Sequence, residues 1–329
     1  MIDNCARRVI IRAERDYMEK AFDIVSLGEI LIDFVPDGAD SFGDEKYLCK
    51  AGGAPLNVLA TGAKFGIKTA FIGKVGNDIF GKKLLRTLAD SGVDSESVIV
   101  DGVHNTTLAF VKLDENGDRD FSFYRGFGAD IYIDESEVDT DKIAASKIFH
   151  FGSLLFTDEP MKSATLYALK IAKENGCVIS YDPNYRPPLW KSETNAVAAM
   201  RENIRLADIV KLSKEEAYLI ADTADVKEAI KTILACGVTA IAVTDGAGDV
   251  YYSVGGEIGI LPAEKVKAVD TTGAGDIFFG TLLMGFVRDG ADLNALTQER
   301  MKQYVGKAIE ISAKSVTKKG AIASIPSEY

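Results

Sequence analysis

The chain has 329 residues, of which 47% are hydrophobic and 26% charged, with a formal net charge of −11 and a pI near 4.9. This charge repels nucleic acid and anionic lipid, and no apolar run approaches the roughly 20 residues that span a bilayer, so we expect a small-molecule partner. Four widely spaced cysteines and only two histidines argue against a disulfide framework and a zinc site, and they favour a reducing cytoplasm.

Residues 1–21 are expected to form an N-terminal extension ahead of a domain that spans residues 22–329. The extension carries Arg and acidic residues and lacks the apolar core and small-residue cleavage site of a secretory signal. Met18 stands just before the first expected strand, so we expect the preceding residues to be a leader outside the folded domain.

The first apolar run, residues 22–35, predicts one buried parallel strand interrupted by Gly28 and Glu29. Asp33 lies near the end of this run. Acidic side chains at strand ends of open α/β sheets often bind ligands, so we expect Asp33 to bind a ligand; a capping or surface role is the alternative.

A glycine pair and a proline precede a small-residue helix that we expect to end near Lys64. Pro55 suits a first helical turn, and Gly52 and Gly53 let a ligand approach the backbone closely. Asn57 lies in the first turn or so, where its amide can face a polar ligand or, alternatively, occupy an exposed helix position.

Alternating βα units follow, with strands at 68–75 and 98–100 and a helix at 78–90. Residues 106–113 and 119–125 then alternate apolar and polar side chains around an Asn-Gly turn, which predicts an antiparallel hairpin. With the polar stretch 36–50, this hairpin predicts a small β-sheet lid over the strand ends, made of residues from about 35 to 51 and from about 104 to 130.

Regular α/β units then resume to the end of the chain. We expect strands at 147–155, 177–181, 209–212, 240–244, 251–254 and 258–261, and helices at 160–175, 277–289 and about 292–315. A proline-stiffened loop at 182–190 is a suitable place for binding groups. The whole pattern predicts an α/β fold with a doubly wound, mostly parallel sheet between helix layers.

The stretch 269–276 precedes an apolar run that predicts a buried helix. The small residues Gly273, Ala274 and Gly275 let backbone amides converge at the helix N-terminus, which favours an anion. Asp276 enters at the first turn, where the helix dipole favours its ionised form and where it can accept a proton. A tight turn with a helix cap is the alternative, and a second Gly-Ala-Gly-Asp at 246–249 precedes a strand and so predicts only a turn.

This carboxylate beside an anion site suggests phosphoryl transfer, although neither a P-loop nor a dinucleotide-binding GxGxxG motif is present. All parallel strands share one carboxyl edge, so early and late residues can meet there. We expect one cleft to contain Asp33, Gly52, Gly53, Asn57, Arg186 and Asp276.

These residues carry a family resemblance that covers roughly residues 22–326. DTTGAGD at 270–276, GGAPLN at 52–57 and VTDG at 243–246 resemble the signatures of the ribokinase and fructokinase (PfkB) carbohydrate kinase family. GEILIDF at 28–34, FYRGFGAD at 123–130 and DPNYRPPLW at 182–190 are most similar to fructokinases.

The resemblance implies a ribokinase-like three-layer αβα fold and ATP-dependent phosphorylation of a sugar hydroxyl, with a homodimer formed through the lid. It implies Asp276 as base, with the amides of Gly273, Ala274 and Gly275 stabilising the transferring phosphate. The implied sugar-binding residues are Asp33, Gly52, Gly53, Asn57, Arg125 and Arg186. The implied nucleotide-binding residues are Lys211, Ser213, Thr244, Gly246, Gly248 and Gly275. Glu216 would act indirectly on Mg²⁺, and Asp270 and Thr272 would lie at a K⁺ site.

Two departures from the family pattern affect the nucleotide side. Ser213 replaces the Asn of an N-x-x-E motif, and Asp249 stands at the last glycine of a T-x-G-x-x-G pattern. Fructose is the expected substrate. The alternatives are a sugar acid such as 2-keto-3-deoxygluconate, whose carboxylate would pair with Arg125 or Arg186, a pentose or nucleoside, and a catalytically silent sugar-binding regulator.

Overall fold

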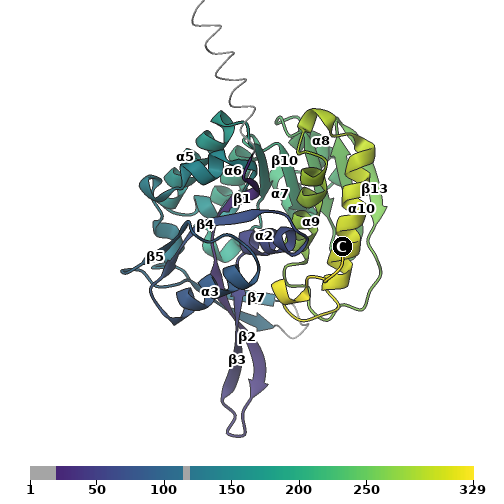
Figure 1. Cartoon of the computed structure of the whole chain (residues 1–329). Helices are drawn as coiled ribbons and strands as arrows, with labels where there is room; N and C mark the ends of the chain where they lie inside the picture. The colour runs from purple at the N-terminus through teal and green to yellow at the C-terminus, as the bar shows by residue number, and fades with distance from the viewer. Residues whose placement is uncertain (1–19, 114–118) are drawn as a thin grey trace, which may run out of the picture.

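The computed structural model describes residues 20–113 and 119–329 (Figure 1). The expected N-terminal extension lies almost wholly outside this part of the chain. Within it, the larger sheet has nine strands in the order β13-β12-β11-β10-β9-β8-β1-β4-β5. The strands are β1 (Phe22–Leu27), β4 (Thr69–Gly76), β5 (Val98–Asp101), β8 (Ser146–Gly152), β9 (Val178–Asp182), β10 (Ile209–Ser213), β11 (Ala240–Thr244), β12 (Asp249–Val254) and β13 (Glu257–Pro262). All neighbours from β5 to β11 pair in parallel, and β12 and β13 add an antiparallel edge.

Helices cover both faces of this sheet, as a parallel sheet requires. One core cluster lies under α2 (Ala54–Lys64), α3 (Ile79–Asp90), α9 (Ala274–Arg288) and α10 (Gln298–Ser315). The other lies under α4 (Thr140–Ala144), α5 (Met161–Glu174), α6 (Glu193–Ile204), α7 (Lys214–Ala221) and α8 (Val226–Leu234). Short 3-10 turns occur at Ala129–Tyr132, Glu135–Glu137, Ser153–Phe156, Pro187–Leu189, Leu293–Ala295 and Ile322–Ser324. The predicted three-layer α/β fold is therefore confirmed.

Helix α9 is apolar on all sides and packs between α2 and α10, with every residue from 276 to 287 buried. This burial explains the uninterrupted apolar run in its sequence. A β-carbon at Gly280 would lie 2.7 Å from the carbonyl oxygen of Val58, so the glycine lets α9 approach α2 closely. The close approach brings the first turns of the two helices together.

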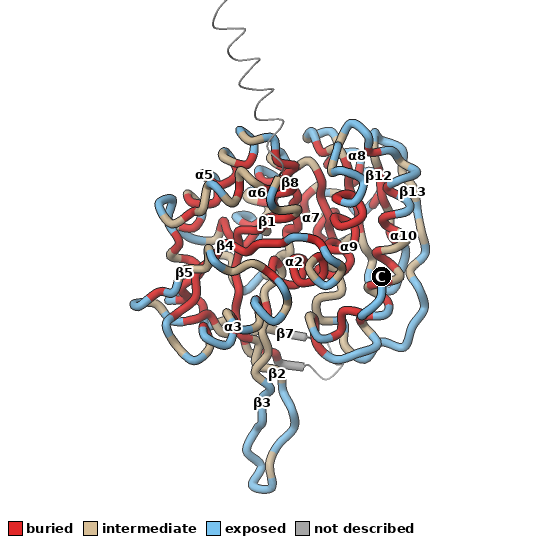
Figure 2. The backbone as a smooth tube through the Cα atoms, viewed as in Figure 1, coloured by how far each residue is buried: buried red, intermediate tan, exposed pale blue. Residues whose placement is uncertain are grey.

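A second, four-stranded sheet projects from the body in the order β3-β2-β6-β7. Its strands are β2 (Leu31–Ala39), β3 (Glu45–Gly52), β6 (Leu108–Leu113) and β7 (Arg119–Tyr124). Figure 2 shows the tip of the β2–β3 hairpin exposed beyond the body, whereas α9 is buried within it. This sheet, called the lid below, matches the small β-sheet predicted from the hairpin pattern.

Two predicted element boundaries are wrong. Residues 22–35 form two strands in different sheets, because the chain leaves the main sheet after Leu27 and enters the lid at Leu31. The last helix begins at Gln298 rather than near 292, because Ala291 adopts a positive φ of 56° and Thr297 caps the helix. No helix in residues 20–113 and 119–329 is long and apolar enough to cross a membrane.

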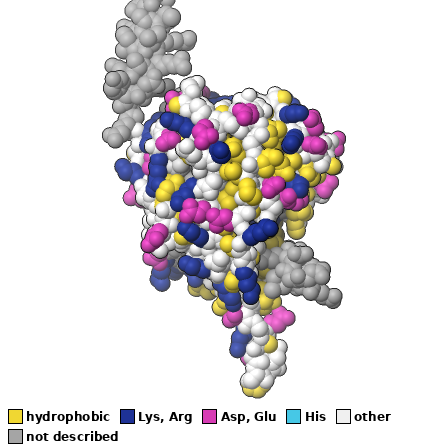
Figure 3. Space-filling view, turned by 90° about the vertical axis from the view of Figure 1, so that its right-hand side faces the viewer, with side chains coloured by type: hydrophobic (Ala, Val, Ile, Leu, Met, Phe, Trp, Pro, Cys, Tyr) yellow, Lys and Arg dark blue, Asp and Glu magenta, His cyan; other side chains and the backbone are white. Residues whose placement is uncertain are grey.

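Charged side chains of both signs are interspersed over the face shown in Figure 3, with hydrophobic side chains gathered in its upper part. The negative net charge is therefore not concentrated in one patch on this face.

Candidate active site

The loop before α9 is held in place at both ends. One carboxylate oxygen of Asp270 accepts hydrogen bonds from the amide (2.9 Å) and hydroxyl (2.5 Å) of Thr272, and the other accepts from the amide of Gly320 (2.8 Å). Gly273 caps the helix in a left-handed conformation with φ of 74°, and a β-carbon there would lie 2.6 Å from that of Ala321. Glycine is therefore required at this turn, which presents the first amides of α9 to the cleft.

Asp276 is buried in the first turn of α9 and is bonded by two amide side chains. Nδ2 of Asn57 donates to Oδ2 at 2.8 Å, and Nδ2 of Asn184 donates to Oδ1 at 3.3 Å. Burial raises the pKa of Asp276 above its ordinary value, although the Asn57 bond, Lys211 and Arg186 oppose this rise. Desolvation therefore opposes the ionised form that the helix dipole favours. A carboxylate with a raised pKa is better suited to accept a proton.

A first cavity, the lid cavity, lies between the lid and the N-termini of α2 and α9. It is lined by Asp276 and by six other predicted residues, namely Asp33, Gly53, Asn57, Arg186, Thr272 and Gly273. Phe121 and Phe123 of β7 and the acidic side chain of Glu29 complete the walls. Oδ1 of Asn57 is buried and has no hydrogen-bond partner among the described residues, so it can accept a hydrogen bond from a ligand.

Gly52 and Gly53, the glycine pair before α2, leave no room for a side chain because residues between β1 and β2 and in β2 pack against them. A β-carbon at Gly52 would lie 2.1 Å from Oδ2 of Asp33, and one at Gly53 would lie 2.6 Å from the carbonyl oxygen of Glu29. Gly53 also has a φ of 117°, which side chains rarely allow. These glycines therefore keep Asp33 and the start of α2 close together.

A second cavity, the central cavity, measures about 560 Å³ and adjoins the first. The two share Asn184, Arg186, Gly273 and Asp276. Lys211, Ser213 and Glu216 line its far side, and a β-carbon at Gly275 would lie 2.8 Å from the ammonium nitrogen of Lys211. The central cavity thus combines a helix N-terminus with lysine and arginine cations, a combination that binds phosphate.

Buried charges lie beneath the central cavity. Nζ of Lys211 contacts Oδ2 of Asp182 at 3.0 Å, and Glu216 accepts hydrogen bonds from the amides of Ser213 (2.7 Å) and Tyr185 (2.8 Å). Burial raises the pKa of Asp182 and of Glu216. Burial alone would lower the pKa of Lys211, but Asp182, Glu216 and Asp276 outweigh it and raise this pKa. Lys211 is therefore charged in an acid-rich pocket.

The same acidic groups bear on metal binding. Within residues 20–113 and 119–329, no three His, Cys, Asp or Glu side chains are grouped to hold a metal ion directly. Burial is the main cause of the raised pKa values of Asp182, Glu216 and Asp276, and repulsion among these three acids adds to it. Hard carboxylate oxygens beside a phosphate site suit Mg²⁺, which binds proteins through few carboxylates and keeps its waters and phosphates.

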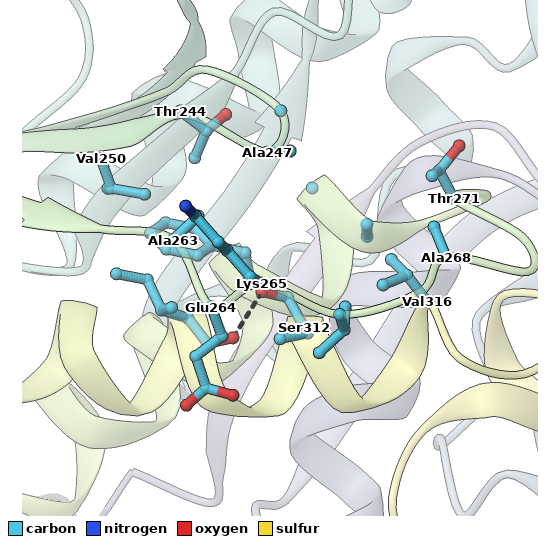
Figure 4. A pocket seen from close by; sticks show the side chains of 17 residues that line it. Thr244, Ala247, Val250, Ala263, Glu264, Lys265, Ala268, Thr271, Ser312 and Val316 are labelled. Atoms are coloured by element: carbon cyan, nitrogen blue, oxygen red, sulfur yellow. Dashed lines mark hydrogen bonds between the residues drawn. The ribbon is translucent and has the colours of Figure 1, made fainter.

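A third cavity, the apolar cavity, measures about 530 Å³ and meets the central cavity at Thr271, Ala274 and Gly275. Figure 4 shows its walls, formed by the β11–β12 turn, the segment after β13 and α10. Thr244 and Gly246 line it as predicted, together with Val250, Phe278, Ile309 and Ala313. Such a wall suits a flat apolar ring system such as a nucleobase.

Four predicted residues, namely Gly52, Asp270, Gly248 and Arg125, line none of these three cavities. Gly248 does not line the apolar cavity, because the turn directs it toward Asp245, whose carbonyl oxygen would lie 2.9 Å from an added β-carbon. Arg125 is buried and does not line the lid cavity; it lines a neighbouring cavity that shares Phe121 and Phe123 with it. Its guanidinium donates to Asp130 (2.7 Å), Thr157 (2.8 Å) and the carbonyl of Leu154 (3.2 Å), so its role in the structure is to fix this part of the wall.

Asn184 and Glu29 belong to the site but were not singled out from the sequence. Asn184 has a positive φ of 46°, which aims its side chain from the 182–190 loop toward Asp276. Asn tolerates this conformation better than most residues, so the Asp-Pro-Asn sequence at 182–184 carried a usable signal. Glu29 gave a weaker signal, as an acid in the middle of an apolar run.

Comparisons with known proteins agree with this arrangement. The sequence pattern of the pfkB family carbohydrate kinases matches residues 21–328. The chain is 41% identical over 306 residues to probable fructokinase-5 of Arabidopsis thaliana, covering 92% of this chain and 94% of that protein. It is 40% identical to fructokinase-2 of Oryza sativa subsp. japonica, covering 92% and 90%.

Solved structures give the same picture. The structure of Xylella fastidiosa fructokinase with bound ATP has a TM-score of 0.86 at 32% identity, covering 94% of this chain and 96% of that one. A double mutant of Vibrio cholerae O395 fructokinase, bound to fructose, ADP and a potassium ion, has a TM-score of 0.83 at 32% identity, covering 93% and 96%.

Proposed function

Because the chain belongs to the pfkB family of carbohydrate kinases, we propose that it transfers the γ-phosphate of ATP to a hydroxyl of fructose, giving fructose 6-phosphate. The observation that carries the proposal is the continuous path of three cavities. Asp276 lies where the lid and central cavities meet, and Ala274 and Gly275 lie where the central and apolar cavities meet. An acceptor, a phosphoryl group and a nucleobase can therefore bind in line.

Asp276 is the general base of this mechanism. The sugar binds in the lid cavity against Asp33 and Asn57, with the reacting hydroxyl directed at the Asp276 carboxylate. The carboxylate accepts the hydroxyl proton as the oxygen attacks the γ-phosphorus, and Asn57 and Asn184 hold its two oxygens in place. The phosphorus–oxygen bond to ADP breaks as the new bond forms.

Charge on the transferring phosphoryl group is stabilised from several directions. The amides of Gly273, Ala274 and Gly275 point to it from the N-terminus of α9, and Lys211 and Arg186 supply positive charge from the facing walls. The nucleobase lies in the apolar cavity beside Thr244 and Gly246.

Two ions complete the proposed site. Glu216, at the edge of the central cavity, would help to hold Mg²⁺, which would neutralise the charge of the phosphates. The loop at Asp270 and Thr272 would hold K⁺, a proposal supported by the potassium ion in the Vibrio cholerae relative. We expect chelation of Mg²⁺ to abolish activity and K⁺ to raise it. Equal rates in Na⁺-only and K⁺-containing buffers would contradict the potassium assignment.

Fructose fits the lid cavity better than a sugar acid does. Asp33, Glu29 and Asp276 line the cavity, and an acid substrate would place its carboxylate among them with Arg186 as the cation of the wall. Arg125, the other candidate partner, is engaged with Asp130. A catalytically silent regulator is disfavoured because the base and the anion loop are both intact.

The experiment that tests this function is an ADP-release assay coupled to NADH oxidation, run with fructose, tagatose, ribose, 2-keto-3-deoxygluconate and adenosine. We expect fructose to give the highest kcat/KM of the set. A higher value for another sugar would reject fructose as the substrate and keep the kinase assignment, whereas ADP release with none of them would reject the kinase assignment as well.

We also propose a homodimer formed through the lid and a cytoplasmic location. The β2–β3 hairpin extends beyond the body and exposes Phe42, Tyr47 and Leu48, which a second copy of the chain would cover. Light scattering at micromolar concentration should give twice the mass of one chain, and a monomeric mass would contradict the dimer. The described cysteines are free thiols, which fits a reducing compartment that cell fractionation can identify.

A further inference from the structure

Glu29 is a buried acid in the active site to which the mechanism above gives no task. It lies in the connector between β1 and β2, where the chain passes from the main sheet to the lid, and only 4% of its surface is exposed. Its side chain lines the lid cavity beside Asp33, Asn57 and Asp276. Oε2 of Glu29 is buried without a hydrogen-bond partner among the described residues.

An unsatisfied buried oxygen costs about 1–3 kcal/mol, so a protein rarely keeps one unless a ligand completes it. The charge of Arg125 acts on Glu29, but its donors bond Asp130, Thr157 and Leu154 and none bonds Glu29. Arg125 therefore acts on Glu29 only through its charge. The partner that Oε2 lacks must come from the cavity.

Several acceptors line the lid cavity. Asp33, Asp276 and Oδ1 of Asn57 can all accept hydrogen bonds from sugar hydroxyls. Asn57 and Asn184 each use one of their two amide N–H donors on Asp276, and the guanidinium of Arg186 is the main other side-chain donor of this wall. Each sugar hydroxyl that donates to one of these acceptors still has lone pairs that need a donor. A neutral carboxyl group can supply that donor, whereas a carboxylate cannot.

We propose that Glu29 is a substrate-binding residue whose neutral carboxyl group donates a hydrogen bond to a hydroxyl oxygen of the bound ketohexose. The proposal rests on the proposed function, because it takes fructose as the ligand of the lid cavity. It adds a protonation requirement that the acceptors Asp33 and Asn57 do not impose.

The electrostatic surroundings of Glu29 favour a neutral form at moderate pH. Burial raises its pKa to about 7, with its own backbone amide and Arg125 opposing the rise and Asp130 and Asp276 adding to it. The other charged groups that line the same cavity are Asp33 and Arg186. If fructose binds only to the protein with neutral Glu29, the affinity for fructose is highest below pH 6 and falls as the pH rises through 7.

The size of this effect follows from the protonated fraction of Glu29. The apparent Kd equals the intrinsic Kd divided by that fraction, so it should rise about 30-fold between pH 6 and pH 8.5. Replacing Glu29 by Gln retains an amide donor that does not titrate, so Kd should stay within about twofold over this range. Glu29→Leu removes the donor and should weaken binding about tenfold at pH 6, as loss of one hydrogen bond does.

Fructose binding measured by calorimetry without nucleotide is the test, since ATP and Asp276 both titrate during catalysis. Asp208→Asn is the control, because Asp208 is also a partly buried acid whose pKa burial raises, but it lies just before β10 and accepts a hydrogen bond from the amide of Ile179 in β9, away from the cleft. This variant should behave as the wild type does. ATP binding by each variant at one pH checks that the fold is intact.

A second measurement needs no variant. Calorimetry of the wild type at pH 7.5, in buffers of different ionisation enthalpy, should detect uptake of roughly 0.7 proton per fructose bound. Zero uptake, an unchanged pH dependence in Glu29→Gln, or Glu29→Leu binding as tightly as the wild type at pH 6 would each overturn the proposal. These results leave fructose phosphorylation by the wild type untouched. A wild type that neither binds nor phosphorylates fructose contradicts the proposed function instead and removes the ligand on which the Glu29 assignment depends.

Discussion

The substitution Asp276→Asn tests the catalytic role of Asp276 separately from its structural role at the start of α9. The new side chain has almost the same shape, and its amide oxygen can still accept from Nδ2 of Asn57 as Oδ2 does at 2.8 Å. Its amide nitrogen then faces the amide of Asn184, so the longer 3.3 Å bond is lost, at a cost of about 1 kcal/mol. Folding and nucleotide binding should therefore remain.

The catalytic loss should be much larger than this structural cost. Removal of a general base lowers turnover by roughly 10²–10⁴, which corresponds to about 2.7–5.5 kcal/mol of barrier. The assay is kcat with saturating ATP, Mg²⁺ and fructose. Asp249→Asn is the control, because it alters the second Gly-Ala-Gly-Asp sequence, where Asp249 is exposed in β12, and it should leave kcat unchanged.

The raised pKa of Asp276 adds a prediction about stability. The folded state holds the proton more tightly than the unfolded state does, so ionisation of Asp276 lowers the free energy of unfolding as pH rises above the ordinary Asp value of about 4. Asp276→Asn lacks this penalty. In urea unfolding, its stability relative to the wild type should thus be greater at pH 8 than at pH 4. A kcat within threefold of wild type, or a relative stability that falls with pH, would refute the reasoning.

Three further substitutions test other parts of the site. Lys211→Met leaves Asp182 buried without its cation. In urea unfolding, this substitution should lower the free energy of unfolding by about 3–5 kcal/mol. A loss below about 1 kcal/mol would contradict the buried ion pair. Gly273→Val adds a β-carbon 2.6 Å from that of Ala321 at a residue with a positive φ. This substitution should lower the thermal unfolding midpoint and reduce kcat at least about tenfold. An unchanged kcat would show that the turn tolerates side chains. Ala313→Trp fills the apolar cavity and should raise KM for ATP at least about tenfold while KM for fructose stays within twofold; an unchanged KM for ATP would place the nucleobase elsewhere.

Local patterns were sufficient to predict much of the fold, but not the places where tertiary packing decides. The apolar run before Arg288 predicted α9 because a helix buried on all sides needs no polar face. The run at 22–35 was misassigned because both of its halves are apolar, and the change of sheet after Leu27 depends on pairing with strands far along the chain. The start of α10 was misplaced because the positive φ of Ala291 has no sequence signal as strong as glycine.

The residues of the site also differ in how far the sequence alone could place them. Asn57 and Asp276 could be placed together from the sequence, because the helices that follow parallel strands begin at one edge of the sheet. Asp33 reaches the same cavity from β2 of the lid, not from a strand end of the main sheet. Arg125 could not be placed, because its bonds to Asp130 and Thr157 form only in the folded chain. Glu29 was missed because an isolated acid in an apolar run shows neither its missing partner nor its raised pKa.

Phosphorus NMR of the complete reaction tests the central claim most directly. The protein is incubated with ATP, Mg²⁺ and fructose, and the products are followed with and without the sugar. The account predicts that ADP and a phosphomonoester form in equal amounts only when fructose is present, and that the ester is fructose 6-phosphate. An active preparation that releases inorganic phosphate instead, or forms no sugar ester while ATP and fructose both bind, would contradict it.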